Sequence, residues 1–255
     1  MARCRARATY SQNSGLPSLI LIRTRLERGH AVVLIIMGLP VCIFAKPPVL
    51  GSVKTRLIPM LGTAGAADLA SAMLRDVWAA VSSCLGVHPV LATTSPGDMP
   101  ISLPQSDIWL QGEGDLGQRI ARIMARALED APAAMAVGAD TPGLSSSHIA
   151  VAIDALRLHD AVIGPALDGG FYLLALRKFN PEFFTSLPWS TPETCAAMKA
   201  RLQKHNLSIA EVEVLFDVDT PADLRLLEQH LTAHPLSAPV TRAWWSRRNM
   251  ILTPA

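Results

Sequence analysis

The chain has 255 residues, of which 50% are hydrophobic and 17% charged, so it is long enough to bury the core of one α/β domain. Its four cysteines contain no C-x-x-C pair, which argues against a disulfide framework or a zinc knuckle and favours the cytoplasm. Six arginines and one glutamate give residues 1–36 a charge of +5, so a total of +2 leaves −3 for the remainder. This mildly acidic body argues against nucleic acid as a partner.

The basic N-terminal segment leads into an apolar run at residues 31–45. This run is shorter than the roughly 20 residues that span a bilayer, and it contains Gly38 and Pro40, so we predict no membrane insertion. We expect translation to start at Met37, and residues 1–36 to be a basic extension that is disordered or not translated.

From residue 41 onward, short apolar runs alternate with helical patterns, which indicates βαβ units and a mostly parallel sheet. We expect one catalytic domain over residues 37–234, followed by a tail over 235–255 that packs one tryptophan on the body. The predicted strands are 41–45, 88–94, 108–110, 133–139, 161–165, 171–176 and 212–216. The predicted helices are 63–85, 114–129, 145–158, 192–205 and 221–230.

A basic loop follows the first predicted strand, at the position where parallel α/β sheets bind their ligands. It differs from both the G-x-x-x-x-G-K-[ST] and the G-x-G-x-x-G phosphate loops. A glycine permits close backbone approach, and three donors in succession suit a di- or triphosphate. The candidate ligand-binding residues are Lys46, Gly51, Lys54, Thr55 and Arg56, the alternative being a solvated surface loop.

Carboxylates follow two other predicted strands. Asp140 stands at a strand end before Pro142, where it is either a metal ligand or part of an Asp-Thr-Pro turn. Asp217 and Asp219 lie at alternate positions of an extended segment, which is a costly arrangement unless a cation or a basic group lies between them. We predict that Asp140 and Asp219 share one Mg²⁺ or Mn²⁺ ion, with Asp217 as a further candidate ligand.

Three more polar positions have both a functional and a structural interpretation. Asp168, which precedes two glycines, is a candidate base or a turn aspartate. Tyr172 is a candidate for stacking on a base or a sugar. Asp115 is expected either to contact the nucleotide or to favour the start of a helix through its charge.

Taken together, six segments resemble the bacterial glycosyltransferase A-like proteins known as radical-SAM/selenodomain-associated transferases. That family is related to the molybdenum-cofactor and phospholactate guanylyltransferases. The resemblance implies a Rossmann-like three-layer αβα sandwich of the nucleotide-diphospho-sugar transferase type, with a metal between Asp140 and the Asp217/Asp219 pair. It does not define the substrate. The segments are FAKPPVLGSVKTRL at 44–57, QGEGDLGQR at 111–119, GADTP at 138–142, GPALDGGFY at 164–172, PWST at 188–191 and DVDTPADL at 217–224.

The expected activity is nucleotidyl transfer from a nucleoside triphosphate to a small phosphorylated or acidic acceptor. Lys54 and Arg56, both expected to be largely exposed, would neutralise phosphates beside the metal. The alternative is glycosyl transfer from a sugar nucleotide, with Asp168 as the base. A nucleotide-binding module without activity is a third possibility.

Overall fold

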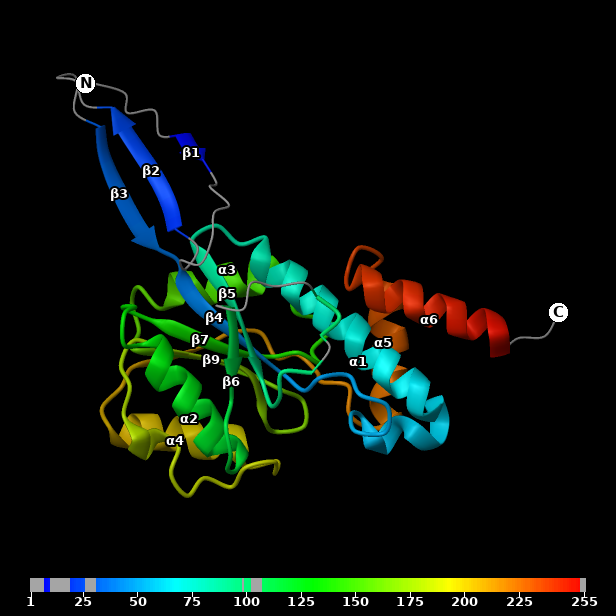
Figure 1. The fold of residues 1–255 in the computed structure, drawn as a ribbon. Coiled ribbons are helices and arrows are strands. Elements are labelled where there is room, and N and C mark those ends of the chain that lie inside the picture. Colours follow the sequence, from blue (N-terminus) through cyan, green and yellow to red (C-terminus); the bar gives the residue numbers. More distant parts are fainter. Residues whose placement is uncertain (1–6, 10–18, 26–30, 98, 102–106, 253–255) are drawn as a thin grey trace.

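The computed structural model describes residues 7–9, 19–25, 31–97, 99–101 and 107–252, and Figure 1 shows their arrangement. The body is built on a seven-stranded sheet in the order β10-β8-β9-β7-β4-β5-β6. Every pairing is parallel except those of β9, which runs antiparallel to both β7 and β8. The strands are β4 (Leu39–Ala45), β5 (Val87–Thr93), β6 (Ile108–Leu110), β7 (Ala134–Gly138), β8 (Ala161–Pro165), β9 (Phe171–Leu176) and β10 (Ile209–Glu211).

Helices cover both faces of this sheet, which confirms the predicted αβα layering. Alternate strand residues face opposite layers: Ile43 packs with α1 and α3, whereas Cys42 packs with α2 and α4. Because both faces are buried, the strands read as continuous apolar runs. The helices are α1 (Ile58–Ser82), α2 (Leu116–Ala127), α3 (Ser146–Ala155), α4 (Thr194–Lys204), α5 (Pro221–Ala233) and α6 (Pro239–Leu252).

The last strand differs from the prediction. We predicted residues 212–216, but β10 ends at Glu211, and Leu215 forms an isolated bridge with Ala166. Val212 still donates its N–H to the Ile163 carbonyl. The next rung of the ladder would need an N–H from Pro165, which has none, so the pairing breaks there. The segment that carries Asp217 and Asp219 therefore leaves the sheet.

The C-terminal tail is a helix that sequence reasoning did not predict. In α6, Trp244 is buried in a third apolar cluster. Its other members include Leu57, which immediately precedes α1, Leu61 of α1, Val218, and Leu227 of α5. One tryptophan thus packs on the body, as expected, and it does so from a regular element. The helical conformation is stabilised by contacts with α1, which lies far away in the sequence, and with the preceding helix α5.

The helical stretch Thr55–Ser82 is, among the described residues, long and apolar enough to cross a membrane by length and composition. It is kinked at Gly62, whose φ of 71° lies in the left-handed region. Leu69, Met73 and Val77 of this stretch are buried against the rest of the fold. Its hydropathy therefore has a structural explanation as that of a core helix.

The extension over residues 1–36 forms strands where the structure describes it. The strands β1 (Arg7–Thr9), β2 (Leu19–Arg25) and β3 (Ala31–Met37) make a separate antiparallel sheet, and the disorder of the extension stays a prediction. Residues 1–6, 10–18 and 26–30 lie outside the described residues. Translation from Met37 stays a prediction.

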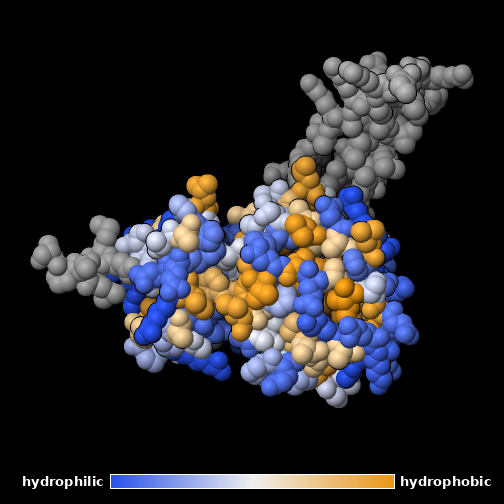
Figure 2. Space-filling view, turned by 180° about the vertical axis from the view of Figure 1, so that it is seen from behind, coloured by the Kyte–Doolittle hydropathy of each residue, from blue (hydrophilic) through white to orange (hydrophobic). Residues whose placement is uncertain are grey.

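Figure 2 shows one face of the molecule, on which hydrophobic side chains gather near the middle among hydrophilic ones. Leu85, Leu158 and Leu236 are examples of large apolar side chains that are largely exposed. Exposed apolar side chains of this kind are common on folded domains. They therefore do not by themselves mark a binding surface.

Candidate functional site

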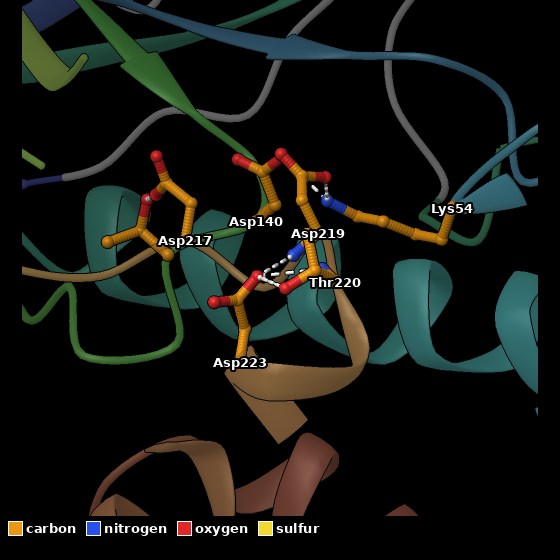
Figure 3. A network of polar contacts seen from close by, with 7 residues as sticks. Lys54, Asp140, Asp217, Asp219, Thr220 and Asp223 are labelled. Carbon is orange, nitrogen blue, oxygen red and sulfur yellow. Dashed lines mark hydrogen bonds and ion pairs between the residues drawn. The ribbon is translucent and has the colours of Figure 1, made fainter. Parts of the chain in front are cut away.

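Three charged residues that are distant in the sequence converge at the carboxyl edge of the sheet. The Lys54 ammonium donates hydrogen bonds to Asp140 Oδ2 and to Asp219 Oδ1, each at 2.7 Å. Lys54 lies in the loop after β4, and Asp140 follows β7, the neighbour of β4 in the sheet. Asp219 immediately precedes Thr220, the N-cap of α5. Figure 3 shows the lysine reaching towards the two carboxylates.

The backbone around Lys54 is fixed by a turn. Lys54 has a φ of 47° in the left-handed region, which costs a residue other than glycine about 1–2 kcal/mol. Its carbonyl accepts a hydrogen bond from the N–H of Leu57, closing the 3₁₀ turn η1 (Thr55–Leu57). Leu57 is fully buried, so it anchors the turn that carries the lysine.

Our expectation that Lys54 would be largely exposed is wrong. Its side chain is 9% exposed, because the two carboxylates hold it against the body. Burial by itself lowers the pKa of Lys54, but the charges of Asp140 and Asp219 outweigh burial and hold that pKa above its ordinary value. The lysine is therefore a permanent cation in this site.

The two carboxylates remain partly open to solvent, with exposed side-chain fractions of 35% for Asp140 and 49% for Asp219. The backbone of Asp219 is held by the capping box of α5, in which Asp223 Oδ2 accepts hydrogen bonds from the N–H groups of Asp219 and Thr220. Thr220 is the N-cap of α5, and Asp223 lies in its first turn. The backbone of Asp219 is thus fixed, and both carboxylates are accessible to a ligand.

Asp217 has a different partner and a different electrostatic state. It accepts a short hydrogen bond from the hydroxyl of Thr141, a buried residue. Burial, followed by the charge of Asp140, raises the pKa of Asp217 to about 7. Figure 3 shows it beside Asp140, on the side away from the lysine. Burial therefore favours the protonated form of Asp217 more than it does for an ordinary carboxyl group.

The donor set can be tested against the divalent metal that the resemblance implies. Across the described part of the chain, no group of three or more His, Cys, Asp or Glu side chains is placed to hold a metal ion. Magnesium needs only one or two protein carboxylates when phosphate oxygens complete its shell. Asp140 and Asp219 fit that requirement, provided that the Lys54 ammonium moves from between them.

The rest of the basic loop is exposed. Lys46, Thr55 and Arg56 are open to solvent, and among the described residues none of them hydrogen-bonds to the carboxylates. Gly51 has a φ of 75°, and a Cβ atom there would meet nothing within 4 Å. This glycine therefore serves the turn conformation, while the space above it stays free for a ligand.

Asp168 lies in the turn between β8 and β9, as its structural interpretation predicted. Its Oδ1 accepts a hydrogen bond from the N–H of Gly170 at 2.8 Å. Gly169 has a φ of 87°, and a Cβ there would overlap the Pro192 carbonyl. The exposed Asp168 carboxylate also contributes to the raised pKa of Asp217, so the turn borders the same site.

The expected stacking role of Tyr172 is not compatible with its position. The side chain is 2% exposed, and its hydroxyl donates to the carbonyl of Glu213 at 2.9 Å. In strand β9, side chains alternate between the two layers, and this alternation turns Tyr172 into the core. Phe171, on the opposite face, is half-buried and packs edge-on against Trp189.

Asp115 is the N-cap of α2. Its Oδ1 accepts from the Gln118 N–H at 2.8 Å, and the Gln118 side chain accepts from the Asp115 N–H. This reciprocal pair favours the structural interpretation, although the carboxylate is exposed.

Sequence reasoning missed Thr141, the partner of Asp217, even though the residue stands next to Asp140 in the GADTP segment.

The chain has similarities to known proteins that agree with this fold. Residues 79–191 match the model of a family described as "Uncharacterized protein conserved in bacteria (DUF2064)". No curated protein matches the chain. A crystal structure from Desulfovibrio desulfuricans G20, described as a candidate nucleotide-diphospho-sugar transferase, has a TM-score of 0.74 and 28% identity, covering 83% of this chain and 95% of that one.

Two cytidylyl-transferring enzymes are more distant. A CMP:2-keto-3-deoxy-manno-octonic acid synthetase complexed with CTP has a TM-score of 0.49 and 15% identity, covering 78% of this chain and 100% of that one. A 2-C-methyl-D-erythritol 4-phosphate cytidylyltransferase from Thermus thermophilus has a TM-score of 0.45 and 18% identity, with coverages of 76% and 98%. The predicted nucleotide-diphospho-sugar transferase fold is confirmed by the Desulfovibrio structure.

Proposed function

We propose that the protein is a divalent-metal-dependent transferase that moves a nucleotidyl group from a nucleoside triphosphate to a small phosphorylated or acidic acceptor. The fold of the Desulfovibrio relative supports a transferase. The observation that carries the proposal is the Lys54 ammonium between Asp140 and Asp219, at the sheet edge where such folds bind their ligands.

The charges of this trio suit a metal–triphosphate complex. One lysine and two aspartates sum to −1, so the site attracts a divalent cation and becomes +1 once the cation is bound. When bound, Mg²⁺ would neutralise phosphate oxygens as a Lewis acid. Lys54 would then turn from the carboxylates to the phosphates, joined by Arg56 and Lys46 from the same exposed loop.

The proposed reaction needs no protein nucleophile. An oxygen of the acceptor attacks the α-phosphorus, the bond from this phosphorus to the bridging oxygen breaks, and pyrophosphate leaves with the bonding electrons. A phosphate or carboxylate acceptor is already ionised and gives up no proton. The task of Lys54 and Arg56 is therefore to stabilise the charge that develops on the leaving phosphates.

Glycosyl transfer from a sugar nucleotide is the second candidate. The description of the Desulfovibrio relative favours it, and the exposed Asp168 carboxylate borders the site, where it would be the base. The Asp168 carboxylate also accepts a hydrogen bond from the Gly170 N–H, which gives it a structural role in the turn. A nucleotide-binding module without activity would need no accessible carboxylates, so the exposure of Asp140 and Asp219 argues against this third candidate.

The finer placement is also part of the proposal. The six sequence segments support membership of the radical-SAM/selenodomain-associated transferases, related to the molybdenum-cofactor and phospholactate guanylyltransferases. Three described cysteines, Cys42, Cys84 and Cys195, are free and buried, which supports a cytoplasmic location. The expected partners are a nucleotide and a small acceptor, without nucleic acid or membrane.

A ligand panel separates the candidates. Thermal unfolding would be measured with each common nucleoside triphosphate and with a set of sugar nucleotides, in the presence and absence of Mg²⁺. A ligand at about 100 times its Kd stabilises the native state by about 2.7 kcal/mol, a readily measured shift. Stabilisation by a triphosphate that requires Mg²⁺ supports nucleotidyl transfer. Stabilisation by sugar nucleotides alone supports glycosyl transfer and overturns the first proposal.

A further inference from the structure

The turn that carries Lys54 ends abruptly. After η1, the chain continues as a single helical turn over residues 58–61 and then breaks at Gly62, whose φ of 71° is incompatible with an α-helix. A helix that stops leaves its last carbonyl groups without N–H partners from the following turn. Met60 and Leu61 immediately precede this break.

A side chain from the C-terminal helix donates hydrogen bonds to the carbonyls of both residues. Arg248 of α6 donates from Nη2 to the Met60 carbonyl at 2.8 Å and from Nη1 to the Leu61 carbonyl at 3.2 Å. Its guanidinium also lies over the Trp244 ring, 5.9 Å from the centroid. A planar fork of donors can satisfy two neighbouring carbonyls at once, which an ammonium cannot do in the same way.

The helix α6 is itself held at its other end. Asp76 of α1, a buried residue, accepts hydrogen bonds from the N–H groups of Val240 and Thr241 at 2.9 and 2.8 Å. These N–H groups belong to the first turn of α6, where a carboxylate is favourable. Asp76 and Arg248 thus attach α6 to α1 on both sides of the Gly62 kink.

The same helix supports both halves of the charged trio through apolar contacts. Trp244 lies in one cluster with Leu57, which closes the Lys54 turn, and with Val218, which precedes Asp219. A shift of α6 would therefore displace residues near Lys54 and residues next to Asp219. Close packing transmits such a displacement because it leaves little free volume.

We propose that α6 is a strut that sets the position of Lys54, with Arg248 as the positioning residue. Arg248 binds the end of segment 54–61, whose first residue is the lysine, and its hydrogen bonds go to the Met60 and Leu61 carbonyls rather than to the three charged residues. As far as ligand affinity is concerned, the inference rests on the proposed function. Its structural part, the order of residues 54–61, is independent of any activity.

Amide hydrogen exchange tests the structural part on the full chain without ligand. In Arg248→Ala we expect the amides of the segment 55–61 to exchange at least several-fold faster than in the wild type. Arg247→Ala is the matched control, because Arg247 is exposed and adjacent. The inference is overturned if these amides exchange at the same rate in the two variants, because the order of the segment then does not depend on Arg248.

Affinity tests the functional part. The probe is whichever Mg²⁺–nucleoside triphosphate stabilises the wild type; if none does, the proposed function fails and the exchange experiment alone decides the inference. We expect Arg248→Ala to raise the Kd about tenfold, Arg248→Lys to raise it less, and Arg247→Ala to leave it unchanged. In a turnover assay the rise would fall on KM, with kcat changed much less. An unchanged Kd in Arg248→Ala would contradict the positioning role.

Chemical rescue separates positioning from general destabilisation. A hollow of about 370 Å³, lined in part by Met60, Trp245 and Arg248, opens beside the guanidinium. Millimolar methylguanidinium can enter it, so we expect this cation to restore most of the triphosphate affinity of Arg248→Ala. The same concentration of methylammonium should not do so. Equal effects of the two cations, or of methylguanidinium on Arg247→Ala, would refute the specific contact.

Discussion

Replacing Lys54 with methionine should move metal and nucleotide affinity in opposite directions. The change keeps the apolar stem but removes the ammonium that lies 2.7 Å from both Asp140 and Asp219. In the wild type a divalent cation without nucleotide has to displace this ammonium. In Lys54→Met the carboxylates face each other without a cation between them, so they should bind the metal more tightly.

The magnitude follows from the two ion pairs. A hydrogen bond to a charged group contributes about 1.5–3 kcal/mol when buried. Both aspartates are about one-third exposed or more, and solvent screens their charges. We therefore estimate that the two ion pairs together contribute about 1–2 kcal/mol. A released interaction of about 1.4 kcal/mol corresponds to roughly a tenfold gain in metal affinity. The loss of the two ion pairs should also lower the free energy of unfolding of the ligand-free protein by about 1–2 kcal/mol.

The assay is Mn²⁺ binding followed by electron paramagnetic resonance, without nucleotide, on the wild type, Lys54→Met and Arg56→Met. Arg56 is the matched control, because it is exposed and forms no hydrogen bond to these carboxylates among the described residues. We expect Lys54→Met to be the one of these variants that binds Mn²⁺ more tightly. We also expect Lys54→Met to bind triphosphate more weakly than the wild type does. Unchanged or weaker Mn²⁺ binding in that variant would refute the idea that the lysine occupies the metal position.

Four further predictions concern stability. Asp140→Asn and Asp219→Asn should each lower the stability of the ligand-free fold slightly, because each removes an ion pair with Lys54; a rise in the chemical-denaturation midpoint would contradict this. The pKa of Asp217 is raised from 3.8 to about 7, so the native state holds a proton that the unfolded chain loses; stability should fall as pH rises from about 4 to 7, and Asp217→Asn should flatten that slope. Asp76→Ala should cost about 2 kcal/mol by removing the carboxylate at the start of α6, whereas Asp68→Ala, an exposed change on the same helix, should cost almost nothing in a urea titration. Gly169→Ala should lower Tm far more than Gly51→Ala, because only at Gly169 does a Cβ atom overlap the Pro192 carbonyl, while both positions have positive φ.

The alternation of strands and helices could be predicted because it depends on local periodicity. The apolar run before Lys46 and the pattern of α2 correspond to observed elements, with boundaries shifted by a few residues. The strand predicted over 212–216 failed because its pairing depends on Pro165 in another strand. Helix α6 was missed because two of the inward-facing positions in its stripe at 241, 244, 245 and 248 are polar, Thr241 and Arg248, so the stripe has no apolar periodicity.

The candidate site was only partly predictable for a similar reason. The position of Asp140 and Lys54 at neighbouring strand ends follows from the sheet topology. The ion pair between Lys54 and Asp219 joins residues 165 positions apart, and no local pattern encodes such a contact. Sequence reasoning therefore placed a metal where the structure places an ammonium. Tyr172 follows two glycines, a pattern that indicates access for a ligand. The alternation of side chains along β9 instead places it in the core.

In the proposed mechanism, the carboxylates freed by Lys54 hold a divalent cation together with a triphosphate. The most direct measurement is calorimetric titration of the wild type, Asp140→Asn and Asp219→Asn with each nucleoside triphosphate, with and without Mg²⁺. We predict that at least one triphosphate binds the wild type only when Mg²⁺ is present and that both variants lose this Mg²⁺-dependent binding. Binding that is independent of Mg²⁺, or that survives in both variants, would contradict the account.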